Sequence, residues 1–557
     1  ATLQLALLLL PLFFHEGEGT LQGTPQLTYK PSVWNGTNGV KHVVFVSVAG
    51  FSPATTLAAM AKKLIDRNNM DVKIDFFCYE QDSMEVRRIL PEGSLHYFDH
   101  GWGPYPDDLR DEVNEKVGRS NVEGLPALAA SMAQSYAYEV SQLWRFINKT
   151  SPDLFVIDIF TASAVDLCAH LNVPYVLHYH PGSLGFGFVG DSLASPSPIS
   201  GQGLKELTFW GRLEKIWDTF RIIPKMISGP AMDLSKQRAL VGLPDFVEPD
   251  KNIRNKVIIA NVVWGFEYSI PMSPLFRPVG MYVDKDPTKA YPKTRSDHQT
   301  LRWIRSTPRK KVVFVSFGTE AMPSESHLQT IIKGIIDAGY RALIAVRKRV
   351  MEHYHITESI LRLRADTCGS YSKRDLRVEQ NWVNSNMVLK SSGVALFITH
   401  GGIRSFTEAA YAHIPIIVWA YGADRKSLGA RVRDRELGSM LDPFTSNSGD
   451  VKKAILELLE PQRRREIVSN LRTFCKLNDV AGAGSAGGAR VIEEVLEFGY
   501  QHLIPIFNNM SFIERNALDA LFVVFLLTVL LPMGIISFGI QMFCPRCCKC
   551  GKKRKLS

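Results

Sequence analysis

The sequence predicts an α/β protein in two halves with parallel sheets, followed by a C-terminal transmembrane helix. Short apolar runs alternate with amphipathic runs along the chain, which is the pattern of repeated strand–helix–strand units. At 557 residues the chain is too long for one compact core, so two domains are expected. Residues 520–540 form an uncharged apolar run about one bilayer thick, which predicts a membrane span.

The strand-like runs fall into two groups of four, separated by a linker. The first half is predicted over residues 40–270 and the second over 299–478. The stretch 271–298 is rich in Pro, Lys and Asp and predicts the linker. Helices are predicted over residues 55–68 in the first half and 326–338 in the second, and a helical segment over 479–515. The predicted strands begin at His42, Val72, Asp153 and Val173, and at Lys311, Arg341, Ala395 and Ile414.

Both ends of the chain carry targeting signals. Residues 1–20 contain a short apolar run and are interpreted as the remnant of a signal peptide, the alternative being a short buried helix. The span is predicted over 518–541, and the basic tail 542–557 places the C-terminus in the cytosol. The globular part is then lumenal. Lys553 and Lys555 resemble a dilysine endoplasmic-reticulum retrieval signal, the alternative being a plain stop-transfer cluster.

Smaller motifs are consistent with a lumenal glycoprotein. Three N-x-[ST] triplets predict glycosylation at Asn35, Asn148 and Asn509. Four cysteines crowd just past the span, and palmitoylation is favoured over zinc binding because a second, separated pair is missing. The net charge of +10 is spread along the chain without a basic block in the globular part, which argues against nucleic-acid binding. The scattered lumenal cysteines are buried thiols or disulfide pairs, and their spacing does not decide: Cys78, Cys168, Cys368 and Cys475.

The most informative stretch is FITHGGIRSFTEAAYAHIPIIVWAYGADR, residues 397–425. A strand ends here, the chain turns through His400, Gly401 and Gly402, and an amphipathic helix begins. Such a turn collects backbone N–H groups and the positive end of a helix dipole at one point, which suits a diphosphate. Spacing alone leaves an ordinary strand–helix unit as an equal alternative.

This stretch resembles the signature of the UDP-glycosyltransferases, in particular the membrane-bound UDP-glucuronosyltransferase type. Thr399, His400, Gly402, Ser405, Glu408, Pro415 and Asp424 are in register with the family pattern. Two positions differ, since Arg404 replaces the usual Asn and Arg425 replaces the usual Gln. The resemblance covers most of the chain and implies the GT-B fold, in which two Rossmann-like domains face a cleft.

The resemblance also implies a site for the UDP-sugar, which is a co-substrate, without a metal ion or other cofactor. Ser316, Gly318 and Thr319 then join His400, Gly402 and Ser405 around the diphosphate. Glu408 accepts from the ribose hydroxyls, Trp382 lies beside the uracil, and Asp424 holds sugar hydroxyls. Arg425 either pairs with a carboxylated sugar or folds away into a salt bridge. The Asp284-Lys285-Asp286 triplet imitates a metal-binding motif but is interpreted as a solvated turn in the linker.

On the acceptor side, the family places a catalytic His at the first turn after strand one, oriented by an Asp. Asp158 matches that Asp, but Pro53 stands where the His is expected. His96, His100, His178 and His180 lie elsewhere in this half and are interpreted as structural. Near residue 210, large apolar side chains recur at helix spacing between basic residues. This helix either lies in a membrane interface or packs on the core.

Two functions from different classes follow. The first is an inverting glycosyltransferase of the endoplasmic-reticulum membrane that moves a hexosyl or glucuronosyl group from a UDP-sugar to a small lipophilic acceptor. The second is a catalytically impaired relative that binds UDP-sugar and serves as a partner or regulatory subunit. The retained His400, Ser405 and Glu408 favour the enzyme, and Pro53 favours the impaired relative. A homo-oligomer is compatible with both.

Overall fold

The computed structural model describes most of the chain and two separate compact units, residues 1–500 and 501–557. The signal-like start, Asn35, Asn509, His100, Cys368, Lys285, Asp286 and the tail beyond residue 543 lie outside the described residues. The described residues are 39–48, 50–98, 107–180, 196–197, 200–244, 252–253, 255–284, 294–306, 311–362, 370–505, 508, 510, 512–515 and 517–543.

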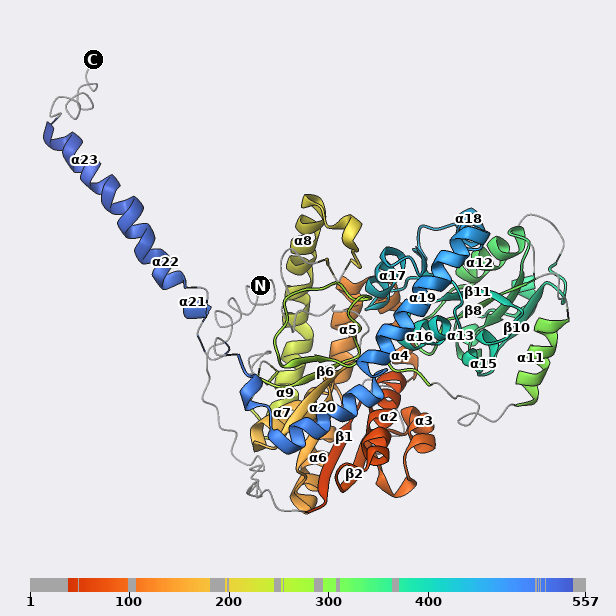
Figure 1. The fold of residues 1–557 in the computed structure, drawn as a ribbon, viewed down its shortest axis with the longest axis horizontal. Helices are drawn as coiled ribbons and strands as arrows, with labels where there is room; N and C mark the ends of the chain where they lie inside the picture. The colour runs from red at the N-terminus through yellow and green to blue at the C-terminus, as the bar shows by residue number, and fades with distance from the viewer. Residues whose placement is uncertain are drawn as a thin grey trace. The chain divides into compact units, whose positions relative to one another are not determined.

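The first half is a parallel sheet of seven strands in the order β3-β2-β1-β4-β5-β6-β7 (Figure 1). Its strands are β1 (Lys41–Val46), β2 (Val72–Tyr79), β3 (Leu95–Phe98), β4 (Leu154–Asp158), β5 (Tyr175–Tyr179), β6 (Ile258–Ala260) and β7 (Phe276–Pro278). The helices are α2 (Phe51–Arg67), α3 (Ser83–Ile89), α4 (Asp107–Arg119), α5 (Asn121–Ala133), α6 (Tyr136–Thr150), α7 (Ala162–Leu171), α8 (Phe209–Met226) and α9 (Met232–Leu240).

The second half is a parallel sheet of six strands in the order β10-β9-β8-β11-β12-β13. Its strands are β8 (Val312–Ser316), β9 (Arg341–Ala345), β10 (Leu376–Glu379), β11 (Val394–Thr399), β12 (Ile416–Trp419) and β13 (Gly438–Leu441). The helices are α11 (Arg295–Arg305), α12 (Glu325–Asp337), α13 (Lys348–His353), α14 (Glu358–Arg362), α15 (Ser385–Leu389), α16 (Ile403–Tyr411), α17 (Arg425–Asp434), α18 (Ser448–Leu458), α19 (Pro461–Ala481) and α20 (Ser485–Phe498).

Both sheets are buried between helices, as parallel sheets require, because their strands are apolar on both faces. The central strands β1, β4, β8 and β11 are almost completely buried. Each half has its own apolar core, one built around β4 and β5 and the other around β8 and β11. Each strand order also reverses direction once, between β1 and β4 and between β8 and β11. In open α/β sheets ligands bind at such reversals, beyond the carboxyl ends of the strands.

The linker prediction was too long. Strand β7 lies inside 271–298 and pairs with β6, so the first sheet continues into the stretch predicted as linker. At its other end, Thr294 caps α11 by accepting from the Asp297 amide, so that helix begins before residue 299. The helix predicted over 55–68 also begins earlier, at Phe51, directly after Gly50.

The chain returns to the first half after completing the second. Helix α20 packs against α2, where Gly488 leaves room for the side chain of Met60 (Figure 1). A bidentate ion pair joins Arg67 on α2 to Glu493 on α20, with Nε–Oε distances of 2.8 and 3.0 Å. Within the helical segment predicted over 479–515, α20 is therefore part of the packing of the first half, whereas residues 501–515 belong to the second unit.

The second unit contains one helix that is long and apolar enough to cross a membrane, residues Leu518–Phe538, with mean hydropathy 2.6. It consists of α22 (Leu518–Phe525), the π-helical turn η8 (Leu526–Leu530) and the start of α23 (Leu531–Phe543), and it is preceded by the short α21 (Phe512–Arg515). None of it is buried against the protein. Its extent matches the predicted span of 518–541 closely.

Candidate active site

The second half gathers polar residues at its strand-order reversal. Ser316 ends β8 and lies in register with Thr399, the last residue of β11. His400 follows β11 directly, and the turn containing Gly318 and Thr319 follows β8. Helix α16 begins one residue after Gly402, which has no side chain to cap the helix. Its first-turn N–H groups, with Ser405 half-buried among them, therefore stay available to an anion.

The ring of His400 fills the space between two glycines. A methyl group on Gly318 would lie 2.6 Å from Cε1 of His400, and one on Gly402 would lie 2.5 Å from Nε2. Gly318 also has φ +64°, a left-handed conformation that side chains disfavour. The glycines at these positions are needed because an imidazole occupies the place of their missing side chains. This packing fixes the ring between the two strand ends.

His400 is neutral at physiological pH. Its side chain is buried, and burial, followed by the positive charge of Arg425, lowers its pKa to about 3. The ring is therefore an uncharged hydrogen-bonding group.

Asp424 and Arg425 begin α17 beside this turn. A methyl group on Gly401, which has φ +93°, would lie 3.1 Å from the Arg425 carbonyl oxygen, so α17 starts in close contact with the turn after β11. Burial lowers the pKa of Arg425 and raises that of Asp424. Arg425 forms no ion pair with a described residue, and its Nη1 is buried without a hydrogen-bond partner among them. The charges of Asp424 and Glu320 act on the guanidinium, and the two expected roles of Arg425, a pair with a carboxylated sugar and an internal salt bridge, both stay predictions.

Trp382 lies in the loop between β10 and α15, with 46% of its surface exposed. An exposed indole at this place is suited to stacking on a planar base. Asn384, which stands where the family has Pro, caps α15 by accepting from the Met387 amide at 3.1 Å. The replacement of that Pro thus has a structural role of its own.

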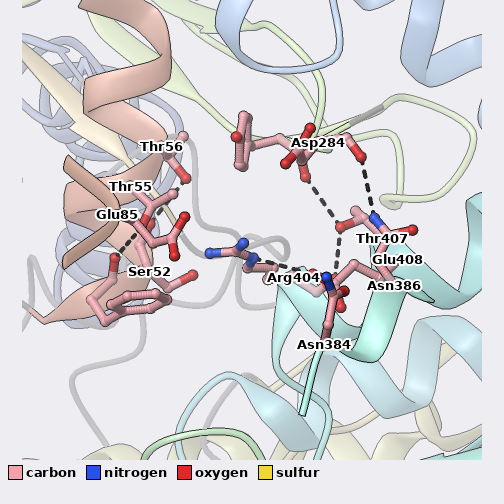
Figure 2. Close-up of polar contacts among 12 residues, drawn as sticks. Ser52, Thr55, Thr56, Glu85, Asp284, Asn384, Asn386, Arg404, Thr407 and Glu408 are labelled. Carbon is pink, nitrogen blue, oxygen red and sulfur yellow. Dashed lines mark hydrogen bonds and ion pairs between the residues drawn. The ribbon is translucent and has the colours of Figure 1, made fainter. Parts of the chain in front are cut away.

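Arg404 extends from α16 toward the first half (Figure 2). Its Nε donates to Glu408 Oε1 at 3.2 Å, and its guanidinium lies 5.5 Å from the centre of the Phe51 ring on α2. Across from it, Ser52, Thr55, Thr56 and Glu85 come from α2 and α3 (Figure 2). Burial raises the pKa of both Glu85 and Glu408, and the positive charge of Arg404 opposes that rise. Arg404 therefore links the two halves, and it also binds Glu408, the carboxylate that was predicted to accept from the ribose hydroxyls.

Pro53 is the third residue of α2 and is buried. A proline is tolerated there because the first N–H groups of a helix have no partner inside it. Asp158 ends β4 and is completely buried. Its Oδ1 accepts from the Phe160 amide at 3.1 Å, and its Oδ2 lies 3.5 Å from Nδ1 of His178. The carboxylate is thus present at the strand end, and its neighbouring imidazole comes from β5 instead of α2.

The fold, with two Rossmann-like halves that meet across Arg404, is of the GT-B class, and solved structures agree. The crystal structure of Medicago truncatula UGT71G1 complexed with UDP-glucose matches with a TM-score of 0.55 at 16% identity, covering 82% of this chain and 99% of that one. The structure of Phytolacca americana UGT2 complexed with UDP-2fluoro-glucose and pterostilbene matches with a TM-score of 0.54 at 15% identity, over 82% and 100%.

Sequence comparisons name the family. The model described as "UDP-glucoronosyl and UDP-glucosyl transferase" matches residues 128–555, and the chain belongs to this family. UDP-glycosyltransferase 708A6 of Zea mays is 25% identical over 482 residues, which is 83% of this chain and 96% of that protein. UDP-glycosyltransferase CGT of Oryza sativa subsp. japonica is 28% identical over 194 residues, covering 33% of this chain and only 41% of the relative.

The structure thus brings the predicted residues together in two groups. His400, Gly318, Gly402, Asp424 and Arg425 form one group at the reversal between β8 and β11. A second group, formed around Arg404 and Glu408 and facing α2 and α3, was only partly predicted (Figure 2). Arg404 was visible in the sequence as a departure from the family pattern. Glu85 carried no signal, since a glutamate in a surface-type helix is ordinary.

Proposed function

We propose that this chain is an inverting UDP-glycosyltransferase that moves a hexosyl or glucuronosyl group to a small lipophilic acceptor at the endoplasmic-reticulum membrane. The observation that carries the proposal is the His400 ring held between Gly318 and Gly402, next to the open start of α16. This arrangement offers a neutral imidazole and free backbone N–H groups to a diphosphate without a metal ion. The family membership supplies the reaction class.

Arg425 supports a carboxylated donor sugar. Arg425 is half-buried, its Nη1 has no hydrogen-bond partner among the described residues, and the charges of Asp424 and Glu320 act on it. An anionic ligand would offset the cost of burying this part of the guanidinium. Asp424, directly before it, would hold neutral hydroxyls. UDP-glucuronate is therefore the first donor to test, with UDP-glucose as the neutral comparison.

The presence of Pro53 in place of a histidine limits the chemical classes of acceptor that we expect to react well. An aliphatic alcohol gains roughly 10²–10⁴-fold in rate from a general base in the transition state. A neutral amine already has a nucleophilic lone pair and sheds its proton after attack. A phenol gives up its proton more easily than an aliphatic alcohol, and a carboxylate has none to lose at pH 7. We therefore expect amines and acidic acceptors to be preferred over aliphatic alcohols.

Two exposed apolar surfaces support a membrane location. The helix Leu518–Phe538 is suited to a span. Helix α8, predicted either to pack on the core or to lie in an interface, turns its large side chains outward, with Trp210 72% and Trp217 64% exposed. Lumenal orientation, retrieval through Lys553 and Lys555, and glycosylation at Asn148, which is exposed near the end of α6, complete the proposal.

A second function is favoured by one observation, the absence of a histidine on the first turn of α2. Such a chain would bind UDP-sugar without turnover and act as a partner or regulatory subunit. UDP release from microsomes, measured over a panel of UDP-sugars and the three acceptor classes, separates the two. If the protein binds UDP but no combination of UDP-sugar and acceptor gives acceptor-dependent UDP release, the proposal that it is an enzyme is refuted.

Protease treatment of sealed microsomes tests the topology. A C-terminal tag should be removed while the globular part is protected, because the tail is proposed to be cytosolic. Protection of the tag would contradict this orientation. Changing Lys553 and Lys555 to Ser should release the protein from the endoplasmic reticulum, and unchanged residence would show that the tail is not its signal.

A further inference from the structure

A row of buried polar side chains crosses the first sheet at its strand-order reversal. Asp158 pairs in register with His178, and Ser47 follows Val46, the partner of Ile157, so Ser47, Asp158 and His178 occupy one row. His180 lies two residues beyond His178, on the same side of the sheet, and is level with Asn261, which follows β6. These residues all lie at the carboxyl ends of strands, and His180 contacts Thr56 on α2.

Most of this row has unpaired polar atoms. Ser47, Asp158, His178 and Asn261 are at most 1% exposed. Within the described part of the chain, no hydrogen-bond partner exists for Oγ of Ser47, Oδ2 of Asp158, either ring nitrogen of His178, or Oδ1 of Asn261. Buried polar atoms without partners are rare in proteins because each costs about 1–3 kcal/mol. Such a concentration at a strand-order reversal points to a functional site.

His180 is the member of this row that can meet a ligand. It is half-buried, whereas His178 is fully buried. Its Nδ1 lies 3.4 Å from Thr56 Oγ1 on α2 and 3.3 Å from Asn261 Nδ2. Its Nε2 makes no hydrogen bond to a described residue. The positive charge of Arg404, on helix α16 of the second half, is one of the causes that lower the pKa of His180.

The neighbours of His180 favour the tautomer with the proton on Nδ1. The Thr56 hydroxyl donates to the Ser52 carbonyl at 3.1 Å, which leaves its oxygen lone pairs to accept from Nδ1–H. As it stands, the Asn261 amide nitrogen can only donate to Nδ1, which would put the ring proton on Nε2. Turning the amide about its last bond places the unpaired Oδ1 at this position, where it accepts from Nδ1–H. This turned arrangement satisfies the buried Oδ1 and leaves the Nε2 lone pair free to accept a proton.

We propose that His180 is the proton acceptor of the transfer step, in place of the histidine that α2 lacks at Pro53. The inference rests on the proposed function. The acceptor's nucleophilic atom uses its lone pair to bond the anomeric carbon of the sugar. The bond from that carbon to the β-phosphate oxygen breaks, and its electron pair leaves with UDP. The acceptor's proton moves to Nε2, and its bonding pair stays on the acceptor atom.

The Asp158–His178 pair would stabilise the protonated ring of His180 without contacting the acceptor. The His178 and His180 rings lie with their centres 5.9 Å apart, so the Asp158 carboxylate supplies negative charge close to the imidazolium that forms. This is a positioning role, since neither residue reaches the acceptor. Burial, followed by the charges of His178 and Arg404, lowers the pKa of His180 to about 3. The ring is therefore neutral before the reaction, and it is suited to protons that become strongly acidic as the new bond forms.

The test compares acceptors with and without a proton to lose, using full-length protein in detergent or microsomes. His180→Gln keeps a hydrogen-bonding side chain but cannot accept the proton at neutral pH. With an arylamine and with a phenol, its kcat should fall about 10²-fold, with KM little changed, and the wild-type solvent deuterium isotope effect should disappear. With an aromatic carboxylate at pH 7, which arrives deprotonated, its kcat should equal that of the wild type.

Three further measurements keep the outcome unambiguous. UDP affinity of His180→Gln should equal the wild-type value, because the diphosphate site lies in the other half. His170→Gln, an exposed histidine at the end of α7, should match the wild type with every acceptor. His178→Gln should show a smaller, acceptor-selective loss.

Equal loss of kcat with all three acceptors would make His180 structural and overturn the inference, and no loss with any acceptor would overturn it too. If the wild type binds UDP but transfers sugar to no acceptor, the proposed function fails first and the inference falls with it.

Discussion

The two halves of this molecule share one strand plan but differ in what stands at its reversal point. Between β8 and β11 the second half holds a single imidazole packed tightly between glycines, beside residues that match the family pattern except at Arg404 and Arg425. Between β1 and β4 the first half has Asp158 but also Pro53 on the adjacent helix, and histidines appear one strand further along. The half proposed to hold the nucleotide therefore has the expected histidine at its reversal point, whereas the half proposed to face the acceptor has its histidines at the end of β5 instead of on α2.

The largest change in activity is expected from placing a histidine on α2, which would make the first half resemble the usual family arrangement. Pro53→His should raise transfer to aliphatic alcohols by about 10²-fold, because the new imidazole would be a base close to Asp158. Pro53→Ala is the matched control and should leave alcohol transfer low. Initial rates with one alcohol and one amine measure the change. If Pro53→His changes neither rate, Asp158 cannot orient a histidine at position 53, and the resemblance to the family's His–Asp pair is refuted.

Disturbing the packing around His400 in the second half should weaken donor binding. Gly318→Ala places a methyl group 2.6 Å from Cε1 of His400, so the ring must move and UDP affinity should fall at least about tenfold. Gly339→Ala is a close control, because Gly339 also has a positive φ, +86°, but faces open space. It should cost about 1 kcal/mol of stability and leave UDP affinity unchanged. Equal UDP affinities in the two variants, by calorimetry, would refute the role of the packing.

Removing the ring should have a smaller effect than displacing it into the site. His400→Ala loses one neutral hydrogen bond, which costs about 1–3 kcal/mol, or roughly 5–150-fold in UDP affinity. Glu408→Ala should weaken UDP by a similar amount if its carboxylate accepts from the ribose despite its contact with Arg404. Titration calorimetry with UDP measures both, and wild-type affinity in both variants would show that UDP binds elsewhere.

The smallest expected effect is on stability as a function of pH. His180 and His400 have folded-state pKa values of about 3, whereas an unfolded histidine titrates near 6.5. Below pH 6.5 the unfolded chain takes up protons that the folded chain refuses, so stability falls as pH decreases. Each residue contributes at most about 1.4 kcal/mol per pH unit.

Comparing variants isolates the contribution of His180. Between pH 6.5 and 5, the thermal midpoint of His180→Gln should fall less than that of the wild type, because the variant has lost one such group. His170→Gln should follow the wild-type curve. Parallel curves for His180→Gln and the wild type would show that His180 is protonated in the folded state.

The sequence was sufficient for the fold class, and it also placed the residues of one candidate site on a single strand–helix unit. His400, Gly402, Ser405 and Glu408 lie on consecutive turns of one strand–helix unit, so their spacing along the chain reflects their arrangement in space. The contact between His178 and Asp158 depends on the register of two strands, and that between His180 and Thr56 on the packing of α2, neither of which a spacing pattern contains. Histidines in β-strands are ordinary core residues, so they were interpreted as structural.

The linker error has a similar cause. Strand β7 is only three residues long and includes a proline, so it lacks the alternation that marks a strand, and it forms because β6 offers an unpaired edge. Arg404 was noticed only as a departure from a pattern. Its contacts with α2 could not be predicted, because the sequence pattern of each half does not specify how the two halves pack against each other.

The return of α20 to α2 determines the order in which the protein can be completed during synthesis. Helix α2 emerges from the ribosome early, yet the partner that covers Met60 and pairs with Arg67 is made more than 400 residues later, since the Arg67 and Glu493 positions are 426 apart. Until then the helix that carries Pro53 has an uncovered face. A first half expressed alone would therefore lack the helix that covers Met60 and pairs with Arg67.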